Sequence, residues 1–315
     1  MRSVPHICPV KTVEKVFLDT VAREGLIPDG SAVTAAVSGG ADSIAMLHLL
    51  RRFSPSRGWR LSVIHIDHGI RAESWEDAEF VDLACRNMDI PCRIVNPPEE
   101  TGGSLESRWS MVRQGLYLES SPVVAVAHTR SDRAETLLLR LVEGSGLRGL
   151  GGMDYRGRGP VVRPLLDLHR DQVREYLIKL DVQWREDATN QDPAQPRHRI
   201  RLKVMPILEE CFPGAVDGLA RSSSVLSAWR DLQDMLGEGL EPGMSREEYA
   251  GYPPAVRMAL LWSLAGKPRS GSEELRKTDA WIVSGGIGEH LLPGGLKLTA
   301  MKDSLRVSTR KGRFR

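Results

Sequence analysis

The feature that most constrains the fold is an alternation of short apolar runs with helical segments along the first two-thirds of the chain. The runs that predict strands cover residues 32–37, 61–66, 92–95 and 123–127. The segments with helical spacing cover residues 44–50, 73–88, 105–118 and 134–142. Strands that are joined through helices pair in parallel. We therefore expect an α/β fold with a doubly wound, mostly parallel sheet.

The pattern changes after residue 166. Helices are predicted from residue 167 or 169 to 180 and over residues 196–208, and Pro213 and Gly214 then break the chain. Beyond the break the spacing is helical to about residue 240, and residues 291–307 predict a small hairpin. We predict one domain over residues 1–213, with a helical extension at 166–213, and a small helical or α+β domain over residues 214–315.

Composition excludes several classes of protein. With 43 basic and 41 acidic residues the net charge is only +2, so any nucleic-acid site must be local. No apolar run reaches the ~18 residues of a membrane span, and the first ten residues hold no apolar run, so we expect neither a membrane segment nor a signal peptide. None of the four cysteines forms a C-x-x-C pair, which disfavours a cysteine-held metal and favours a reducing cytoplasm.

Residues 38–43 read S-G-G-A-D-S and lie between the first predicted strand and the helix after it. Two glycines let the backbone turn and point N–H groups inward, and the helix adds its positive N-terminal end, so this turn predicts a phosphate site. It lacks the G-K-[ST] ending of a Walker A loop. Asp42 instead suits a Mg²⁺ ion beside pyrophosphate, and Ser38 and Ser43 can donate to phosphate oxygens. The plainer alternative is that Ser43 only caps the helix.

A second glycine-rich stretch, residues 144–149, matches G-x-G-x-x-G letter by letter. A dinucleotide fingerprint must follow a strand and open a helix. This stretch follows a predicted helix, so we reject a nicotinamide cofactor.

Other polar residues follow the remaining predicted strands, where ligands of doubly wound sheets bind. His65 follows the second long strand, and its surroundings lack the spacing of a helical zinc motif, so we expect it to shape the mouth of the site. His128 follows the strand at 123–127 and could contact a phosphate or accept a proton. Asp132 and Glu135 share a helix face and could hold Mg²⁺ or an ammonium group, or form a solvated first turn.

A basic cluster lies in the predicted extension. Arginines alternate there with other residues, and they could contact nucleic-acid phosphates or form a solvated helix face. The cluster consists of Arg197, Arg199 and Arg201.

The loop at residues 38–43 resembles that of the PP-loop ATP pyrophosphatases, and six further stretches narrow the resemblance. In order along the chain they are residues 65–71, 127–137, 144–150, 163–166, 186–190 and 197–201. Together they resemble the tRNA(Ile)-lysidine synthase family over roughly residues 30 to 210. The resemblance implies the PP-loop, adenine nucleotide α-hydrolase-like version of the doubly wound fold, and a C-terminal domain that contacts tRNA.

The resemblance also implies a chemistry. Members of this family are ligases that use ATP and Mg²⁺ to join free L-lysine to C2 of the wobble cytidine of tRNA(Ile) with a CAU anticodon. The reaction passes through an adenylated cytidine and releases AMP and pyrophosphate. It would place the protein in the cytoplasm without a membrane partner, and a homodimer stays open.

Roles for individual residues follow from the same resemblance. The implied catalytic residues are Asp42, which would also hold the Mg²⁺, and His128, Asp132 and Glu135. The implied ATP-binding residues are Ser38, Gly39, Gly40, Ala41, Asp42, Ser43, His65, Gly146 and Arg148. The implied tRNA-binding residues are Arg113, Arg197, Arg199 and Arg201.

The chain departs from the family pattern at several positions. The departures include Ser110, Gln114, Ser131 and His198, and Ser131 replaces the first of two paired aspartates. Two alternatives therefore stay open. One is another PP-loop tRNA-modifying enzyme such as a thiolase, which the cysteine pattern disfavours. The other is a noncatalytic homologue that binds tRNA or nucleotide.

Overall fold

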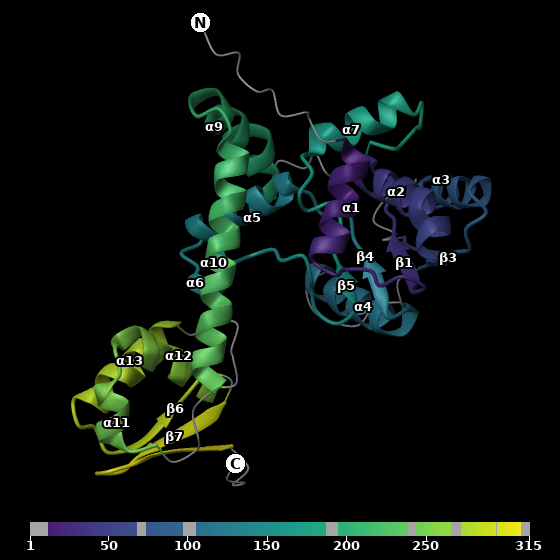
Figure 1. Cartoon of the computed structure of the whole chain (residues 1–315). Coiled ribbons are helices and arrows are strands. Elements are labelled where there is room, and N and C mark those ends of the chain that lie inside the picture. The colour runs from purple at the N-terminus through teal and green to yellow at the C-terminus, as the bar shows by residue number, and fades with distance from the viewer. Residues whose placement is uncertain are drawn as a thin grey trace, which may run out of the picture. The chain divides into compact units, whose positions relative to one another are not determined.

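The computed structural model describes residues 12–67, 74–96, 105–186, 195–238, 244–265, 272–293 and 295–309. The chain divides into two compact units (Figure 1). The first consists of Met1–Glu143 and Gly152–Ser223, and the second of Gly144–Gly151 and Ser224–Arg315. No helix among the described residues combines the length and the apolarity needed to cross a bilayer.

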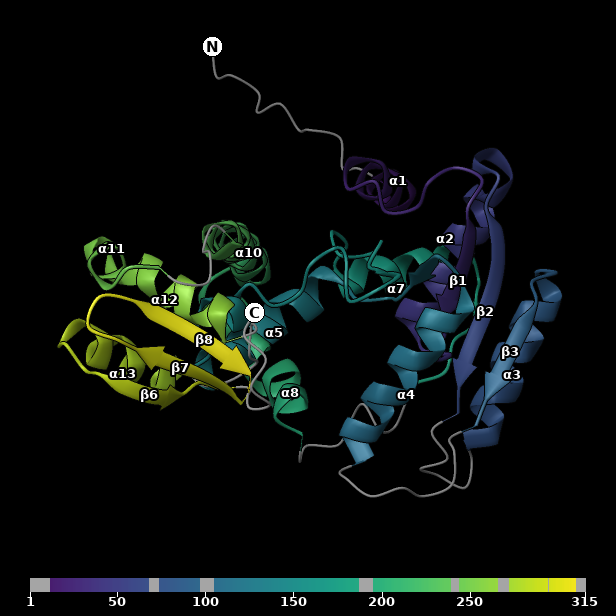
Figure 2. The ribbon, with the colours of Figure 1, turned by 90° about the horizontal axis from the view of Figure 1, so that it is seen from below.

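The first unit is built on a five-stranded sheet with the order β3-β2-β1-β4-β5. Every neighbouring pair in it is parallel, and β1 and β2 run side by side in Figure 2. The strands are β1 (Ala32–Ala36), β2 (Arg60–Ile66), β3 (Cys92–Val95), β4 (Val123–Ala125) and β5 (Val161–Val162). The expected doubly wound parallel sheet is therefore confirmed. The two-residue strand β5 was not predicted, because so short a run has no period to detect.

Helices join these strands, as the alternating pattern predicts. They are α2 (Ala41–Arg57), α3 (Ser74–Asn87), α4 (Leu105–Ser120) and α5 (Arg130–Val142). A further helix, α1 (Val13–Arg23), precedes β1 and was not predicted. The first half of helix α2 is mostly buried, with Ile44, Met46, Leu47 and Leu50 in the core, so this half packs inside the unit. It ends at Gly58, which adopts the left-handed conformation that suits a helix C-terminus.

The predicted helical extension is present. It contains α7 (Arg170–Lys179), α8 (Pro196–Arg199), the π-helical segment η2 (Ile200–Val204) and α9 (Met205–Cys211). Helix α10 (Ala215–Glu238), the long green helix of Figure 1, begins after the break at Pro213 and Gly214. The division between the compact units falls inside α10, between Ser223 and Ser224, whereas the sequence places a boundary near Pro213.

The second unit is α+β. Its sheet has the antiparallel order β6-β7-β8, with β6 (Gly288–Leu291), β7 (Leu296–Ala300) and β8 (Leu305–Thr309), where the hairpin is predicted. The helices α6 (Leu147–Leu150), α11 (Arg246–Gly251), α12 (Pro254–Leu264) and α13 (Ser272–Val283) belong to the same unit. Tyr249, Leu261, Ile282 and Leu298 lie in its own apolar core.

Candidate active site

The turn at residues 38–43 connects β1 to α2 and has the geometry of an anion-binding loop. Gly39 has a φ of +93°, a conformation that other residues rarely adopt, and a Cβ there would lie 3.5 Å from Val81 Cγ2. The N–H groups of Ser38 and Gly39 each donate to Ser43 Oγ over 3.2 Å. Ser43 in turn donates to the carbonyl of Gly40 over 2.9 Å. Its hydroxyl therefore closes the turn.

Ser43 is not the N-cap of α2, which was the simpler alternative for this residue. The N-cap of α2 is Gly40, which makes no side-chain capping bond. Ala41 and Asp42 occupy the first turn of this 17-residue helix, whose amino end favours negative charge. The loop thus leads into a helix amino terminus, whose first N–H groups have no partner within the helix and can bind an anion.

The surroundings of Asp42 disfavour its ionised form. Burial, and then the nearby charge of Asp132, raise the pKa of Asp42 to about 6. Its Oδ2 lies 3.6 Å from Arg170 Nε, and its buried Oδ1 has no hydrogen-bond partner among the described residues. A hard cation held by one carboxylate and by substrate phosphates is the usual Mg²⁺ arrangement, so this oxygen fits such an ion.

His65 ties the ends of two strands together. Its Nδ1 lies 2.8 Å from the carbonyl oxygen of Val37, and because a carbonyl only accepts, Nδ1–H is the donor. The ring thus links β2 to the start of the loop. No group of three potential metal-ligating side chains occurs in the described ranges. His68 and Arg71, which accompany His65 in the sequence motif, lie outside those ranges.

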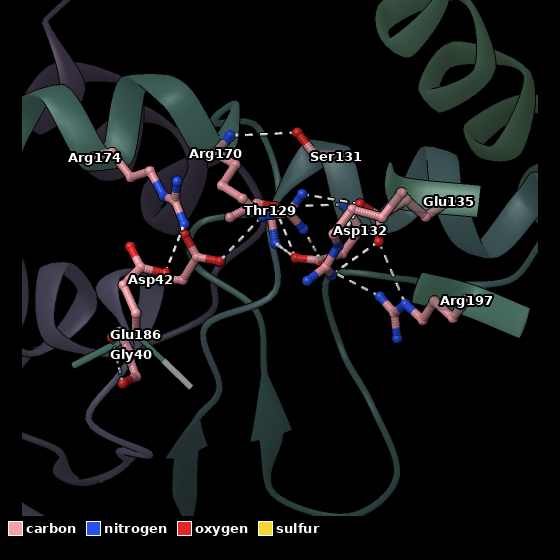
Figure 3. A network of polar contacts seen from close by, with 12 residues as sticks. Gly40, Asp42, Thr129, Ser131, Asp132, Glu135, Arg170, Arg174, Glu186 and Arg197 are labelled. Carbon is pink, nitrogen blue, oxygen red and sulfur yellow. Dashed lines mark hydrogen bonds and ion pairs between the residues drawn. The ribbon is translucent and has the colours of Figure 1, made fainter. Parts of the chain in front are cut away.

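A buried pair of carboxylates occupies the first turns of α5 (Figure 3). Thr129 is the N-cap of α5 and forms a capping box with Asp132, whose Oδ2 accepts from the N–H of Thr129 over 2.8 Å. Glu135 lies one turn further on, and its side chain is 2% exposed. The sequence predicts that these two carboxylates share a face, and the helix places them so.

Three guanidinium groups surround this pair. Arg170 donates to Asp132 Oδ1 and to Glu135 Oε1, over 2.9 Å in each case. Arg201 donates to Asp132 over 3.1 Å and to Glu135 over 2.9 Å. Arg197 donates to the same two residues over 3.1 and 3.5 Å. Dashed lines in Figure 3 mark contacts of Arg170 and Arg197. We call the contacts of the three arginines with Asp132 and Glu135 the arginine–carboxylate network.

The network controls the ionisation of Asp132. Burial by itself would raise the pKa of Asp132, but Arg170 and Arg197 beside it hold the pKa well below its usual range. Asp132 is therefore ionised throughout the physiological range of pH.

Arg170 is the residue that sequence reasoning missed. It is the first residue of α7 and contacts both Asp42 and the carboxylate pair. Arg170 therefore connects the turn at residues 38–43, which we call the phosphate loop, to α5. A basic residue at a helix amino end is electrostatically unfavourable, and this was the only local signal available. Its partners lie 35 and 38 residues earlier in the chain, so no local pattern could identify them.

The departure at Ser131 has a structural explanation. Ser131 Oγ accepts from the backbone N–H of Arg170 over 3.3 Å. An N–H at the start of a helix has no partner within the helix, so an oxygen at position 131 supplies one. A serine oxygen can meet this need as a carboxylate does.

We therefore expect Ser131→Asp to retain catalytic turnover within about 3-fold, because the acceptor for Arg170 N–H is kept. Ser131→Ala removes it and should lower the free energy of unfolding by about 0.5–1.5 kcal/mol. Urea denaturation and turnover of both variants check this. Equal stability of Ser131→Ala and the unmodified protein would contradict the capping role.

The other predicted site residues are not part of the arginine–carboxylate network. His128 follows β4, and its Nδ1 accepts from Arg163 Nε over 3.1 Å. Arg199 and Arg113 are exposed, on α8 and α4. Gly146 is the N-cap of the short helix α6 in the second unit. The backbone of Arg148 is in that helix, and its side chain lies outside the described part.

The glycine-rich stretch at residues 144–151 has a packing role in the second unit. A Cβ at Gly149 would lie 2.7 Å from Ser145 Cβ, and one at Gly151 would lie 3.0 Å from the Cα of Ser227 on α10. Both distances are too short for any larger residue without movement of the backbone. The stretch also follows helix α5, in agreement with the rejection of a dinucleotide fingerprint.

Comparison with known proteins identifies the family to which this chain belongs. The model of the PP-loop domain matches residues 11–208. The tRNA(Ile)-lysidine synthase of Solibacter usitatus is 38% identical over 209 residues, which are 64% of this chain and 47% of that protein. The enzyme of the same name from Azoarcus is 35% identical, over 78% of this chain and 58% of its own length. The chain thus spans about half the length of these two curated relatives.

A third relative matches nearly end to end. The tRNA(Ile)-lysidine synthase of Parasynechococcus marenigrum is 33% identical over 304 residues, and the alignment covers 90% of each chain. Among solved structures, a U34-tRNA thiolase from Methanococcus maripaludis has a TM-score of 0.57 at 18% identity, over 73% of this chain and 79% of that one. That likeness extends to the fold alone.

Proposed function

Because this chain belongs to the tRNA(Ile)-lysidine synthase family of PP-loop proteins, we propose that it ligates free lysine to C2 of the wobble cytidine of tRNA(Ile) with a CAU anticodon. ATP is cleaved between its α- and β-phosphates, the cytidine O2 takes up the adenylyl group, and the amine of lysine displaces AMP. The observation that carries this proposal is Arg170, which joins the phosphate loop to a buried carboxylate pair within one network.

The loop would bind the phosphates of ATP. The N–H groups at the start of α2 and the positive end of its helix dipole would stabilise the negative charge that develops on pyrophosphate as it leaves. Asp42 would hold Mg²⁺ through its unpartnered Oδ1, and the ion would offset the charge that develops on pyrophosphate.

The carboxylate pair would bind the cationic substrate. Asp132 and Glu135 already bind guanidinium groups, and the same oxygens can accept from an ammonium. Arg197 is the arginine most easily displaced, because its 3.5 Å contact with Glu135 is the longest to the pair and its side chain, 33% exposed, is the most exposed of the three. Lysine would then replace Arg197 while Arg170 and Arg201 stay in place.

Transfer RNA would contact the exposed face of α8. Arg199 is exposed there, whereas Arg197 and Arg201 turn toward the carboxylates. We expect Arg199→Ala to weaken tRNA binding by about 3- to 10-fold and to reduce the slope of log K against log salt by about 1. Lys179→Ala, an exposed basic residue at the far end of α7, serves as the matched control. A salt slope unchanged by Arg199→Ala would exclude a phosphate contact.

The direct test is incorporation of labelled lysine into tRNA with ATP and Mg²⁺. The substrate is tRNA(Ile) with a CAU anticodon, and the control is the same tRNA with uridine in place of the wobble cytidine. Incorporation that requires the cytidine supports the proposal. If ATP binds but no lysine is incorporated into either tRNA, the chain is a binding homologue or modifies another acceptor.

A further inference from the structure

The side chain of His128 is held by a partner that sequence analysis did not identify. Arg163 directly follows β5, and its Nε lies 3.1 Å from His128 Nδ1. A guanidinium has donors only, so Nδ1 must present its lone pair. The imidazole is then neutral, and its proton is on Nε2.

We propose that Arg163 is a positioning residue that fixes His128 as a neutral Nε2–H donor toward the bound nucleotide, so that His128 does not serve as the base. This rests on the function proposed above, for which sequence reasoning left both roles of His128 open. The tautomer follows from the chemistry of the partner, because a guanidinium can only donate.

Arg163 is itself anchored on the backbone around it. Its Nη1 donates to the carbonyl of Asp154 over 2.8 Å, and its own N–H donates to the carbonyl of Tyr155 over 2.8 Å. A Cβ at Gly157 would lie 3.2 Å from Nη1, so the glycine leaves the space that the guanidinium needs. These contacts keep Nε directed at the imidazole.

The charges around the ring also keep it neutral. Arg163 lies after β5, Arg197 on α8 and Arg113 on α4, while Asp132 on α5 acts in the opposite sense. Burial first, and then these arginines against Asp132, lower the pKa of His128 to about 4. The ring therefore carries no charge at neutral pH.

The position of His128 suits a donor to a nucleotide. It follows β4, whose Ala125 pairs with Ala35 of β1, and β1 leads into the phosphate loop. The carboxyl ends of neighbouring parallel strands meet at one edge of a sheet, where such folds bind nucleotides. A proton on Nε2 can there be donated to an oxygen or ring nitrogen of the nucleotide.

The tautomer of His128 can be determined without measuring catalysis. Nitrogen NMR of ¹⁵N-histidine-labelled protein, assigned with His128→Ala, should show Nε2 protonated and Nδ1 unprotonated from pH 5.5 to 8. Arg163→Lys should keep this pattern, because an ammonium is also only a donor. Arg163→Met should give mixed tautomers and a titration that moves upward into the range of pH 5 to 7. A wild-type ring that is protonated on Nδ1, or that titrates near pH 6.5, would overturn the proposal even if Arg163→Met failed to fold.

The role of the donor is tested by calorimetric titration with ATP and by pyrophosphate release. A glutamine can donate from its amide but cannot act as a base. His128→Ala should therefore lose at least about 10-fold in ATP affinity and in pyrophosphate release, and His128→Gln should lose clearly less in both. Equal losses in the two variants would reject the donor role. If the wild-type protein failed to modify tRNA at all, the NMR result would still decide the tautomer, so the two failures are distinguishable.

Discussion

Replacing Asp42 by asparagine should lower pyrophosphate release by about 10³-fold or more and, in the same variant, raise the free energy of unfolding of the ligand-free protein by about 1–3 kcal/mol. The loss of activity follows from removal of the charge that would hold Mg²⁺ through Oδ1. The gain in stability follows from burial, which raises the pKa of this carboxyl from 3.8 to about 6 and makes its ionised form unfavourable in the folded state.

The gain should depend on pH in a defined direction. A group whose folded pKa is raised stabilises the fold below its unfolded pKa, and that stability is lost as the pH rises through the folded pKa. The difference between Asp42→Asn and the unmodified protein should therefore vanish below about pH 4 and be complete above about pH 6. Urea denaturation at several pH values measures it.

A matched control is available in Asp171. It also lies in the first turn of a helix, α7, but it is exposed. Asp171→Asn should change stability by less than about 0.5 kcal/mol and leave turnover intact. If Asp42→Asn proved less stable than the unmodified protein at pH 7, Asp42 would be compensated in the absence of ligand. Turnover within about 10-fold of the unmodified protein would contradict its role at the metal.

The second large effect is expected at Glu135. Glu135→Ala should lower the free energy of unfolding by about 3–5 kcal/mol, because Arg170 and Arg201 would lose one of their carboxylate partners and the network would hold three guanidinium groups against Asp132. Glu143→Ala, at the end of the same helix, removes an exposed pair with Arg140 and should cost less than about 0.5 kcal/mol. Similar losses in the two variants would show that the network adds no stability.

The proposed binding of lysine by Glu135 can be tested separately from its structural role. Glu135→Gln keeps the size and one acceptor oxygen but removes the charge. We expect it to raise the KM for lysine by about 10-fold or more while the KM for ATP stays within about 2-fold, since only the ammonium needs the carboxylate. A KM for lysine that did not change would place the amine elsewhere.

Much of the first unit could be predicted from local sequence. The runs at residues 32–37, 61–66 and 92–95 correspond to β1, β2 and β3, because short apolar runs between helical segments are typical of strands in a parallel sheet. The turn at residues 38–43 could also be predicted, since its glycines, its small hydroxyl side chains and the helix after it are adjacent in the chain. Local chemistry of this kind needs no distant partner.

The basic cluster shows what the sequence could not resolve. Arg197 and Arg201 are four residues apart and contact the same carboxylates, whereas Arg199 between them is exposed. The spacing separates the two faces of the helix, but it cannot say which face meets an acidic partner and which meets solvent. That choice depends on α5, whose carboxylates lie 62 to 69 residues away in the chain.

The sequence by itself determined the alternation of strands and helices, the glycine-rich turn at residues 38–43 and the pair of carboxylates on one helix face, because each depends on neighbours within a few residues. Only the tertiary structure decided that Arg170 links Asp42 to that pair, that Arg163 orients His128, and that Ser131 supports Arg170. Each of these contacts joins segments that are distant in the chain, and the energy of a charge or a hydrogen bond depends on which groups the packed fold brings within about 3 Å.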